Sequence, residues 1–132
     1  MKGLLDTHVF LWAVFSPEKL SAAIQTLIED ESNPLFLSTI SQKEIALKYG
    51  MGKLELQGCS PEELPEIASA MQLELLHPSA EELASFHRLP RVAHKDPFGR
   101  LIIWQALQNK LHLVSKDQRL SDYQSLGLKV IW

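Results

Sequence analysis

The sequence predicts an α/β domain, a three-layer sandwich in which helices flank a mainly parallel central sheet of about five strands. Short apolar runs of strand length alternate along the chain with segments of helical periodicity. The 132 residues, 45% hydrophobic and 22% charged, match a globular chain long enough to form one core. No internal repeat or linker divides the sequence, so we expect one domain over residues 1–132.

The strands and helices are expected in a regular order. Apolar runs predict strands near residues 2–5, 35–38, 73–76, 111–114 and 128–131. Apolar residues spaced three and four apart predict a helix over 20–28, and Pro17 and Ser21 are plausible start signals. Further helices are expected near 40–50, 61–71, 79–88 and 97–109. The last one is apolar nearly all round, which predicts burial on more than one side.

Several classes of protein are excluded by what the sequence lacks. The single cysteine, Cys59, cannot form an internal disulfide and indicates a reducing compartment. The apolar run over 9–15 is far shorter than the ~18 residues that span a bilayer, so we expect a cytoplasmic protein with no membrane association. No HExxH, CxxC, GxGxxG, P-loop or GxSxG motif occurs, which argues against zinc, dinucleotide, P-loop and esterase sites.

Four acidic residues stand where chemistry is expected in an α/β sheet. Asp6 directly follows the first predicted strand, and Asp117 follows the strand over 111–114. Ligands bind outside the carboxyl ends of such strands. Glu44 lies within a predicted helix, and Asp96 opens the most apolar helix. Because crowded carboxylates need a balancing cation, convergence of these four would indicate a metal-dependent hydrolase of phosphodiesters.

Asp6 and Glu44 also have structural explanations. Asp6 can cap the helix that follows it, and one oxygen could cap while the other faces a metal. Glu44 and Lys48 have the spacing of an i,i+4 ion pair, worth roughly 0.2–0.5 kcal/mol. On a helical wheel, however, Glu44 falls within an apolar stripe formed by Ile40, Leu47 and Met51. A charge inside such a stripe favours a functional role.

Asp96 and Asp117 are less distinctive on their own. Asp96 stands directly before Pro97, and Asp at the N-cap with Pro at the first helical position is a strong helix-start signal. Asp117 follows Ser115 and Lys116 in a predicted loop, and its value comes from its combination with Asp6.

The charge distribution bears on nucleic-acid binding. The formal net charge of −3 argues against a strong, nonspecific binder of duplex DNA. Residues 87–100, however, carry a net charge of +3 before histidines are counted, from Arg88, Arg91, Lys95 and Arg100 against Asp96. This strip could hold a phosphate backbone, or it could be a solvated loop. Trp12 and Trp104 lie in apolar segments, and we interpret them as core residues rather than base-stacking platforms.

Four motifs agree in order and spacing with one known family. They are Leu4-Leu5-Asp6-Thr7-His8 with Trp12; Glu44-Ile45-Ala46-Leu47-Lys48 with Gly52-Lys53-Leu54; His94-Lys95-Asp96-Pro97-Phe98 with Arg100-Leu101-Ile102; and Leu113-Val114-Ser115-Lys116-Asp117. Taken together, these motifs resemble the PIN-domain nucleases, and most closely the VapC-type toxins of bacterial and archaeal toxin–antitoxin pairs. The resemblance runs from one end of the chain to the other.

The resemblance implies a fold, an activity and partners. It implies a small α/β sandwich whose acids gather at one sheet edge and bind Mg²⁺ or Mn²⁺. It further implies an endoribonuclease that cleaves RNA, is usually a homodimer and is silenced by a cognate antitoxin. Asp6, Glu44 and Asp117 match the family's acidic positions and are the expected catalytic residues, and Ser115 matches a small hydroxyl residue. We expect Asp6 and Asp117 to bind metal, Glu44 to bind it or orient the attacking water, and Asp96 to be a further candidate ligand.

One position departs from the family. The family sequence Asp-Pro-Phe-Asp-Arg carries a usual metal ligand as its second acid, whereas this chain has Gly99 there. Glycine in a helix interior is roughly 1 kcal/mol less favourable than alanine, so helix propensity gives no reason for it. Three explanations stay open: a naturally degenerate nuclease, takeover of the role by Asp96, or a substitution that disarms a toxin.

Two other classes compete with the nuclease. The first is a PIN-like module that binds RNA or an antitoxin without cutting. The second is a phospho-receiver domain, which also has acids at strand ends. A receiver usually has an acidic pair after its first strand and an Asp after a middle strand, and neither feature is found here.

Overall fold

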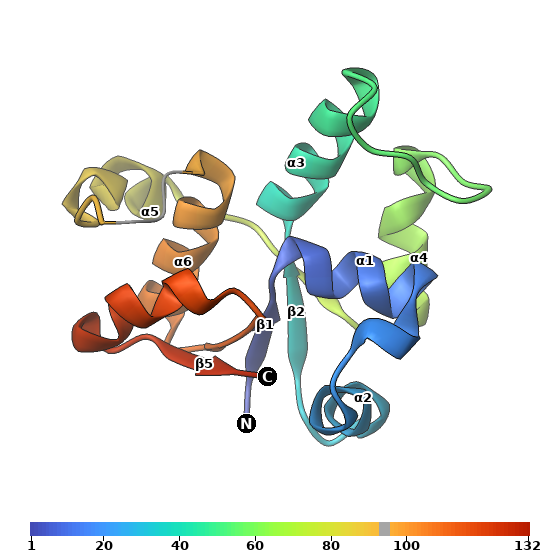
Figure 1. Cartoon of the computed structure of the whole chain (residues 1–132). Coiled ribbons are helices and arrows are strands. Elements are labelled where there is room, and N and C mark those ends of the chain that lie inside the picture. Colours follow the sequence, from blue (N-terminus) through green and yellow to red (C-terminus); the bar gives the residue numbers. More distant parts are fainter. Residues whose placement is uncertain (93–95) are drawn as a thin grey trace.

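The computed structural model describes residues 1–92 and 96–132 and contains one five-stranded parallel sheet. The strands are β1 (Gly3–Leu5), β2 (Leu35–Ser38), β3 (Glu74–Leu76), β4 (His112–Val114) and β5 (Lys129–Ile131). Their spatial order is β3-β2-β1-β4-β5, and every neighbouring pair is parallel (Figure 1). The predicted strands and the predicted α/β class are confirmed.

Helices connect the strands. The α-helices are α1 (Thr7–Phe15), α2 (Ala22–Glu29), α3 (Thr39–Gly50), α4 (Leu64–Ala70), α5 (Ala80–Ser85) and α6 (Pro97–Asn109). Among the described residues they are accompanied by the 3-10 helices η1 (Pro17–Lys19), η2 (Pro61–Glu63), η3 (Phe86–Arg88) and η4 (Gln118–Leu126). The predicted helices over 61–71 and 79–88 each divide into an α-helical and a 3-10 part, and η4 was not predicted. Ser21 caps α2 as expected, because its Oγ accepts a hydrogen bond from the backbone N–H of Ile24.

Helices cover both faces of the sheet and make three layers (Figure 1). Successive strand residues point to opposite faces, so Leu5 belongs to the hydrophobic cluster that α1, α2 and α4 cover, and Leu4 to the cluster that α6 covers. In α6 the five consecutive residues from Ile102 to Ala106 are all buried, which confirms the prediction of burial on more than one side.

A polar contact fixes α6 against the sheet. The hydroxyl of Ser38, at the end of β2, donates a 2.5 Å hydrogen bond to Oε1 of Gln105. The Gln105 amide in turn donates to the backbone oxygen of Leu76, at 3.5 Å. Both Ser38 and Gln105 are fully buried, so this contact satisfies polar groups that would otherwise lose their hydration.

The strand order places the two acid-bearing strand ends side by side. β1 pairs with β4 in a register that sets Leu5 opposite Val114. The chain runs from β1 through β2 to β3 on one side and then returns to β4 on the other side of β1. The strand order therefore reverses between β1 and β4, and a crevice at the carboxyl ends of these strands is the usual ligand position in an open α/β sheet.

Helix length bears on membrane association. The longest α-helix among the described residues, α6, has 13 residues, whereas a transmembrane helix needs about 20. In the part of the chain that the structure describes, no helix is long and apolar enough to cross a bilayer.

Candidate functional site

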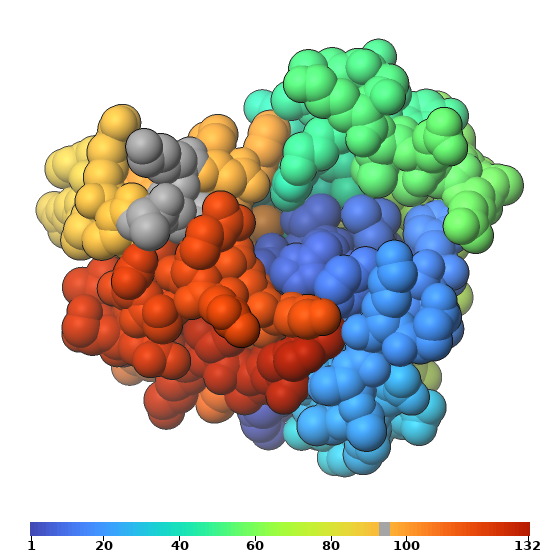
Figure 2. Space-filling view, viewed as in Figure 1, coloured from blue at the N-terminus to red at the C-terminus, as the bar shows by residue number. Residues whose placement is uncertain are grey.

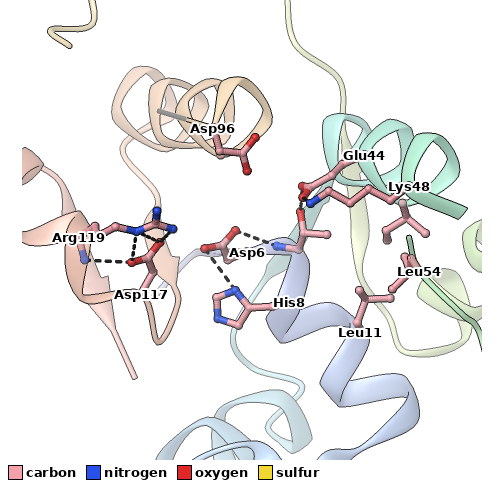
Figure 3. A pocket seen from close by; sticks show the side chains of 12 residues that line it. Asp6, His8, Leu11, Glu44, Lys48, Leu54, Asp96, Asp117 and Arg119 are labelled. Carbon is pink, nitrogen blue, oxygen red and sulfur yellow. Dashed lines mark hydrogen bonds and ion pairs between the residues drawn. The ribbon is translucent and has the colours of Figure 1, made fainter. Parts of the chain in front are cut away.

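A cavity of about 270 Å³ opens at the carboxyl ends of β1 and β4. Its lining includes all four acids that the sequence singled out, Asp6, Glu44, Asp96 and Asp117, together with Gly99 (Figure 3). On the molecular surface it is a hollow with the N-terminal segment at its floor, α3 on one side and the C-terminal segments on the other (Figure 2). Side chains from four separate segments thus meet around one space.

Asp6 lies at the centre of this cavity and caps α1. Its Oδ1 accepts a 2.9 Å hydrogen bond from the backbone N–H of Thr7, as the capping interpretation predicted. Its Oδ2 accepts a 2.7 Å hydrogen bond from the Ser115 hydroxyl and lies 3.7 Å from Nδ1 of His8. Both oxygens of Asp6 therefore have partners within the chain.

Ser115 links two of the acids. Its hydroxyl donates to Asp6 and accepts a 3.1 Å hydrogen bond from the backbone N–H of Asp117. Ser115 is buried, at the end of β4, and its own N–H is bonded to the backbone of β5. The small hydroxyl residue two positions before the last acid thus sets the position of Asp6 relative to Asp117.

The first wall of the cavity contains Thr7, Glu44 and Lys48, and is called the N-terminal wall below. The Thr7 hydroxyl donates to Oε1 of Glu44 at 2.8 Å and is also hydrogen-bonded to the Ser41 hydroxyl at 2.8 Å. Nζ of Lys48 lies 2.5 Å from Oε2 of Glu44. This hydrogen bond, with Asp96 adding a smaller attraction, raises the pKa of Lys48 above its ordinary value. The Glu44 side chain is only 8% exposed, so a buried carboxylate is held by two side chains, Thr7 and Lys48.

The expected surroundings of Glu44 were wrong in one respect. Leu47 and Met51, which a helical wheel places beside Glu44, are 47% and 54% exposed. Glu44 is instead buried with Ser41 and Ile45 on the face of α3 that meets α1. The buried face of α3 is therefore partly polar, and the apolar residues of the last turn point to solvent. The predicted ion pair with Lys48 is present.

The second wall consists of Asp96, Gly99, Asp117 and Arg119, and is called the C-terminal wall below. Asp117 caps η4 and forms a bidentate ion pair with the Arg119 guanidinium. Its Oδ1 lies 3.0 Å from Nε, and its Oδ2 lies 2.8 Å from a terminal nitrogen. These hydrogen bonds raise the pKa of Arg119. Arg119 is 58% exposed, whereas Asp117 is 17% exposed. Oδ1 of Asp96 accepts from the backbone N–H of Phe98, so the predicted cap of α6 is present.

The basic strip over 87–100 has a mixed outcome. Arg100 is turned inward, because its guanidinium donates to the backbone oxygens of Leu89 and Pro90 and lies over the Phe86 ring. Arg88 and Arg91 are exposed. Lys95 and the neighbouring His94, which belong to the strip and to the third motif, lie outside the described residues.

The donor chemistry of the cavity suits a hard divalent cation. Four carboxylates offer oxygen ligands only, as Mg²⁺ and Mn²⁺ prefer. With Glu44 paired to Lys48 and Asp117 to Arg119, the four acids leave a formal charge of −2, before His8 is counted. Within residues 1–92 and 96–132, no three acidic, histidine or cysteine side chains already lie close enough to bind one ion. The residues fit the ion in type and charge, and binding requires side chains to turn from their present partners.

Several residues of the site were missed from the sequence. Thr7 holds Glu44 and is itself hydrogen-bonded to Ser41, Arg119 holds Asp117, and His8 joins α1 to the loop after β4 by accepting from the backbone N–H of Lys116. The pattern Asp-x-Arg at 117–119 is a weak signal for the ion pair. Thr7 and Ser41 are 34 residues apart, so their contact depends on the fold and leaves no local pattern.

Comparisons with known sequences place the chain in a family. The PIN domain model matches residues 3–126. Ribonuclease VapC22 of Mycobacterium tuberculosis is 30% identical over 129 residues, which cover 98% of this chain and 97% of that protein. The resemblance predicted from the four motifs is confirmed.

Solved structures share the fold. VapBC2 from Rickettsia felis, bound to a DNA fragment from its promoter, contains a chain that superposes with a TM-score of 0.68 at 18% identity, covering 99% of this chain and 98% of that one. FitAB bound to a DNA fragment gives a TM-score of 0.63 at 18% identity, with 98% and 93% covered. DNA-bound VapBC from Salmonella typhimurium gives 0.62 at 18% identity, with 99% and 97% covered. The family model, the full-length relative and the shared fold agree: this chain belongs to the PIN-domain family and is VapC-like.

Proposed function

We propose that this chain is an endoribonuclease toxin that depends on Mg²⁺ or Mn²⁺, forms part of a toxin–antitoxin pair, and cleaves weakly because of Gly99. The observation that carries the proposal is the cavity where Asp6, Glu44, Asp96 and Asp117 meet at the point of strand-order reversal. The substrate class is inferred from the ribonuclease that is 30% identical over almost the whole chain. An antitoxin partner is inferred from the VapBC complexes that share the fold. A homodimer acting in the cytoplasm completes the proposal.

A divalent cation, when bound, supplies the charge that activates water and stabilises the departing oxygen in phosphodiester hydrolysis. Asp6, Asp117 and Asp96 are the proposed ligands in this chain. Asp6 is positioned by Ser115 and by its capping bond, so that its place relative to Asp117 is set before any ligand arrives. Because both Asp6 oxygens already have partners, a bound ion would have to replace at least one of these hydrogen bonds.

Glu44 is proposed to bind the ion or to orient the attacking water. Thr7 donates to one of its oxygens and Lys48 to the other, which fixes the orientation of the carboxylate. The carboxylate oxygens keep further lone pairs that can accept a hydrogen bond from a water molecule. The N-terminal wall thus presents one oriented, charged carboxylate to the cavity.

Gly99 is the proposed cause of weak activity. It lines the cavity in the first turn of α6, at the position where the family has an acid. Without that carboxylate the cavity has one anionic ligand fewer, and metal affinity is expected to fall. Asp96 lines the same cavity, but one of its oxygens is committed to the cap of α6, which limits how far it can replace the missing group.

The test compares this chain with Gly99→Asp in the cleavage of single-stranded RNA with Mn²⁺. We expect Gly99→Asp to cleave at least about tenfold faster, because a ligand is restored. Asp6→Asn in the Gly99→Asp background is the matched control and should abolish both cleavage and the rise in melting temperature that Mn²⁺ causes. Equal and robust cleavage by the chain with Gly99 and by Gly99→Asp would contradict the role given to position 99.

A second function is favoured by Gly99 itself and by the paired state of the carboxylates. It is a degenerate PIN-like module that binds RNA or an antitoxin without cutting. This alternative predicts that Mn²⁺ leaves the melting temperature of the chain unchanged and that Gly99→Asp alone gives no cleavage. A metal-dependent rise that Asp6→Asn removes would exclude it.

A further inference from the structure

Beside the acidic cavity lies a cluster of aromatic rings and lysines that the proposed chemistry does not use. The ring of Trp12, on α1, contacts the rings of His8 at 4.9 Å and Trp132 at 5.9 Å between centroids. Nζ of Lys116 and Nζ of Lys19 lie 5.8 Å and 5.9 Å from the centre of the Trp12 ring. These residues come from α1, η1, the loop after β4 and the end of β5, so the fold alone brings them together.

The interpretation of the tryptophans as core residues holds for only one of the two. Trp104 is 9% exposed, and its ring N–H donates to the backbone oxygen of Glu82. Trp12 and Trp132 are half-buried and pack against the edge of the core. Large aromatic rings at such a boundary keep part of their surface available for a ligand.

The ammonium groups of Lys19 and Lys116 are available to bind an anion. Within the described residues neither Lys19 nor Lys116 forms an ion pair, and each is held over an aromatic ring instead. Lys116 is exposed, and its backbone is fixed by the hydrogen bond to His8. A positioned and unpaired ammonium group can bind a phosphate without breaking an existing salt bridge.

A second cavity joins this cluster to the acidic one. It has a volume of about 540 Å³, and its lining includes Lys116, Asp117, Val130 and Trp132. Asp117 lines both this cavity and the acidic cavity, so the two share a wall. The two cavities therefore lie on either side of Asp117.

We propose that the cavity between Asp117 and Trp132 binds the segment of single-stranded RNA adjacent to the phosphate that is cleaved. This inference rests on the proposed function for the identity of the ligand. A phosphodiester in the acidic cavity has nucleotides on both sides, and the cavity on the other side of Asp117 lies next to it to receive one of them. Trp132 then offers a surface for base stacking, and Lys116 a charge for the neighbouring phosphate.

Trp132 and Lys116 together favour single-stranded RNA over duplex RNA. In an A-form duplex the base faces are stacked on one another and cannot reach a tryptophan ring. Stacking on Trp132 requires an unpaired base, whereas the lysine contact alone would accept either form. Recognition by stacking tolerates any base, so this part of the site is expected to bind RNA with little sequence preference.

Binding is tested without cleavage, in EDTA, with a fluorescently labelled oligouridine of eight nucleotides. Trp132→Leu is expected to weaken binding about tenfold, within the range of one stacked base. Lys116→Ala is expected to weaken binding at least about threefold and to reduce the slope of log K against log salt by about 0.7. Tyr49→Leu and Lys2→Ala replace an exposed aromatic residue and an exposed lysine outside both cavity linings, and they should change the affinity less than about twofold.

The outcomes separate this inference from the proposed nuclease activity. Unchanged affinity in both Trp132→Leu and Lys116→Ala overturns it, even if the chain cleaves RNA with Mn²⁺; this is also the result expected if an antitoxin peptide occupies the cavity instead. Absence of oligouridine binding by the unchanged chain overturns it as well, as does equal binding of a duplex of the same length. Binding that both variants weaken, in a chain that never cleaves, supports the RNA site and rejects the nuclease. Equal melting temperatures of the variants show that the losses are not due to unfolding.

Discussion

The two walls of the acidic cavity hold their carboxylates in opposite ways. In the N-terminal wall, Glu44 is buried and bonded to Thr7 and Lys48. In the C-terminal wall, Asp117 is bonded to a guanidinium that is 58% exposed, and glycine stands next to the cap residue Asp96 in the cavity lining. The N-terminal wall contains the buried residues Thr7 and Glu44, whereas the C-terminal wall contains an ion pair at the molecular surface. Changes in the first should therefore act on stability, and changes in the second on ligand binding.

Glu44→Ala gives the largest expected effect on stability. It removes the carboxylate that accepts from the buried Thr7 hydroxyl and should lower the free energy of unfolding by about 2 kcal/mol. Asp117→Ala is the comparison in the other wall and should cost below about 1 kcal/mol, since it removes an exposed ion pair and a cap. Urea unfolding in EDTA measures both values. Equal losses in the two variants would remove the distinction between the walls.

Thr7→Val tests the same wall with a change of similar volume. Loss of the hydroxyl should lower the free energy of unfolding by about 1 kcal/mol, or the melting temperature by about 3–5 °C in a chain of this size. Thr26→Val, at an exposed position of α2, is the matched control and should leave the melting temperature within about 2 °C. A Thr7→Val protein as stable as the control would show that the buried hydrogen bonds contribute no net stability.

Arg119→Ala tests whether the C-terminal wall acts on ligand binding. It removes the guanidinium partner of Asp117, so the affinity for Mn²⁺ should rise about three- to tenfold, while the stability without metal should change little because the ion pair is exposed. The rise in melting temperature with Mn²⁺ concentration reports the affinity. Arg88→Ala, outside the cavity lining, serves as control. Weaker Mn²⁺ binding by Arg119→Ala would mean that Arg119 supports the metal site rather than competing with it.

The smallest effect concerns pH. Because the pKa of Lys48 is raised in the folded chain, the stabilisation by its contact with Glu44 is complete below the ordinary lysine value of 10.5 and is lost as pH rises through the folded value. The difference in unfolding free energy between the chain and Lys48→Met should stay constant up to about pH 10 and shrink above it. Its size should be below about 1 kcal/mol, since Lys48 is 44% exposed. A difference that instead falls below pH 7 would contradict this assignment.

The sequence predicted the sheet well because buried parallel strands are short and apolar throughout. Short apolar runs such as 35–38 and 111–114 are typical of buried parallel strands, and each contains a strand in the structure. The 3-10 helix η4 was missed, since residues 118–126 are mostly polar and its buried residues Leu120 and Tyr123 are three apart, a spacing too brief to define a period. Lys110 adopts a left-handed backbone conformation, which its sequence position did not indicate because lysine, unlike glycine, is uncommon in this conformation.

The acids of the site were predictable and their partners were not. Asp6 and Asp117 follow strand ends, and this position is visible in the sequence. The contact of Thr7 with Glu44 joins residues 37 apart, and the contact of Ser115 with Asp6 joins residues 109 apart. Such contacts depend on helix orientation to within an ångström, which periodicity does not specify. The same limit explains why a helical wheel did not reveal that Leu47 and Met51 are exposed while Glu44 is buried.

The buried hydrogen bond between Ser38 and Gln105 fixes one point along α6, and this point can serve as a pivot for the rest of the helix. Asp96 lies nine residues from Gln105, roughly 13 Å along the helix axis at 1.5 Å per residue. A tilt of roughly 5° about that pivot would shift Asp96 by about 1 Å, and Gly99 by somewhat less. The Ser38–Gln105 contact is thus one of the contacts that position α6, and a Gln105 substitution that preserved the fold is expected to alter the spacing of the acids.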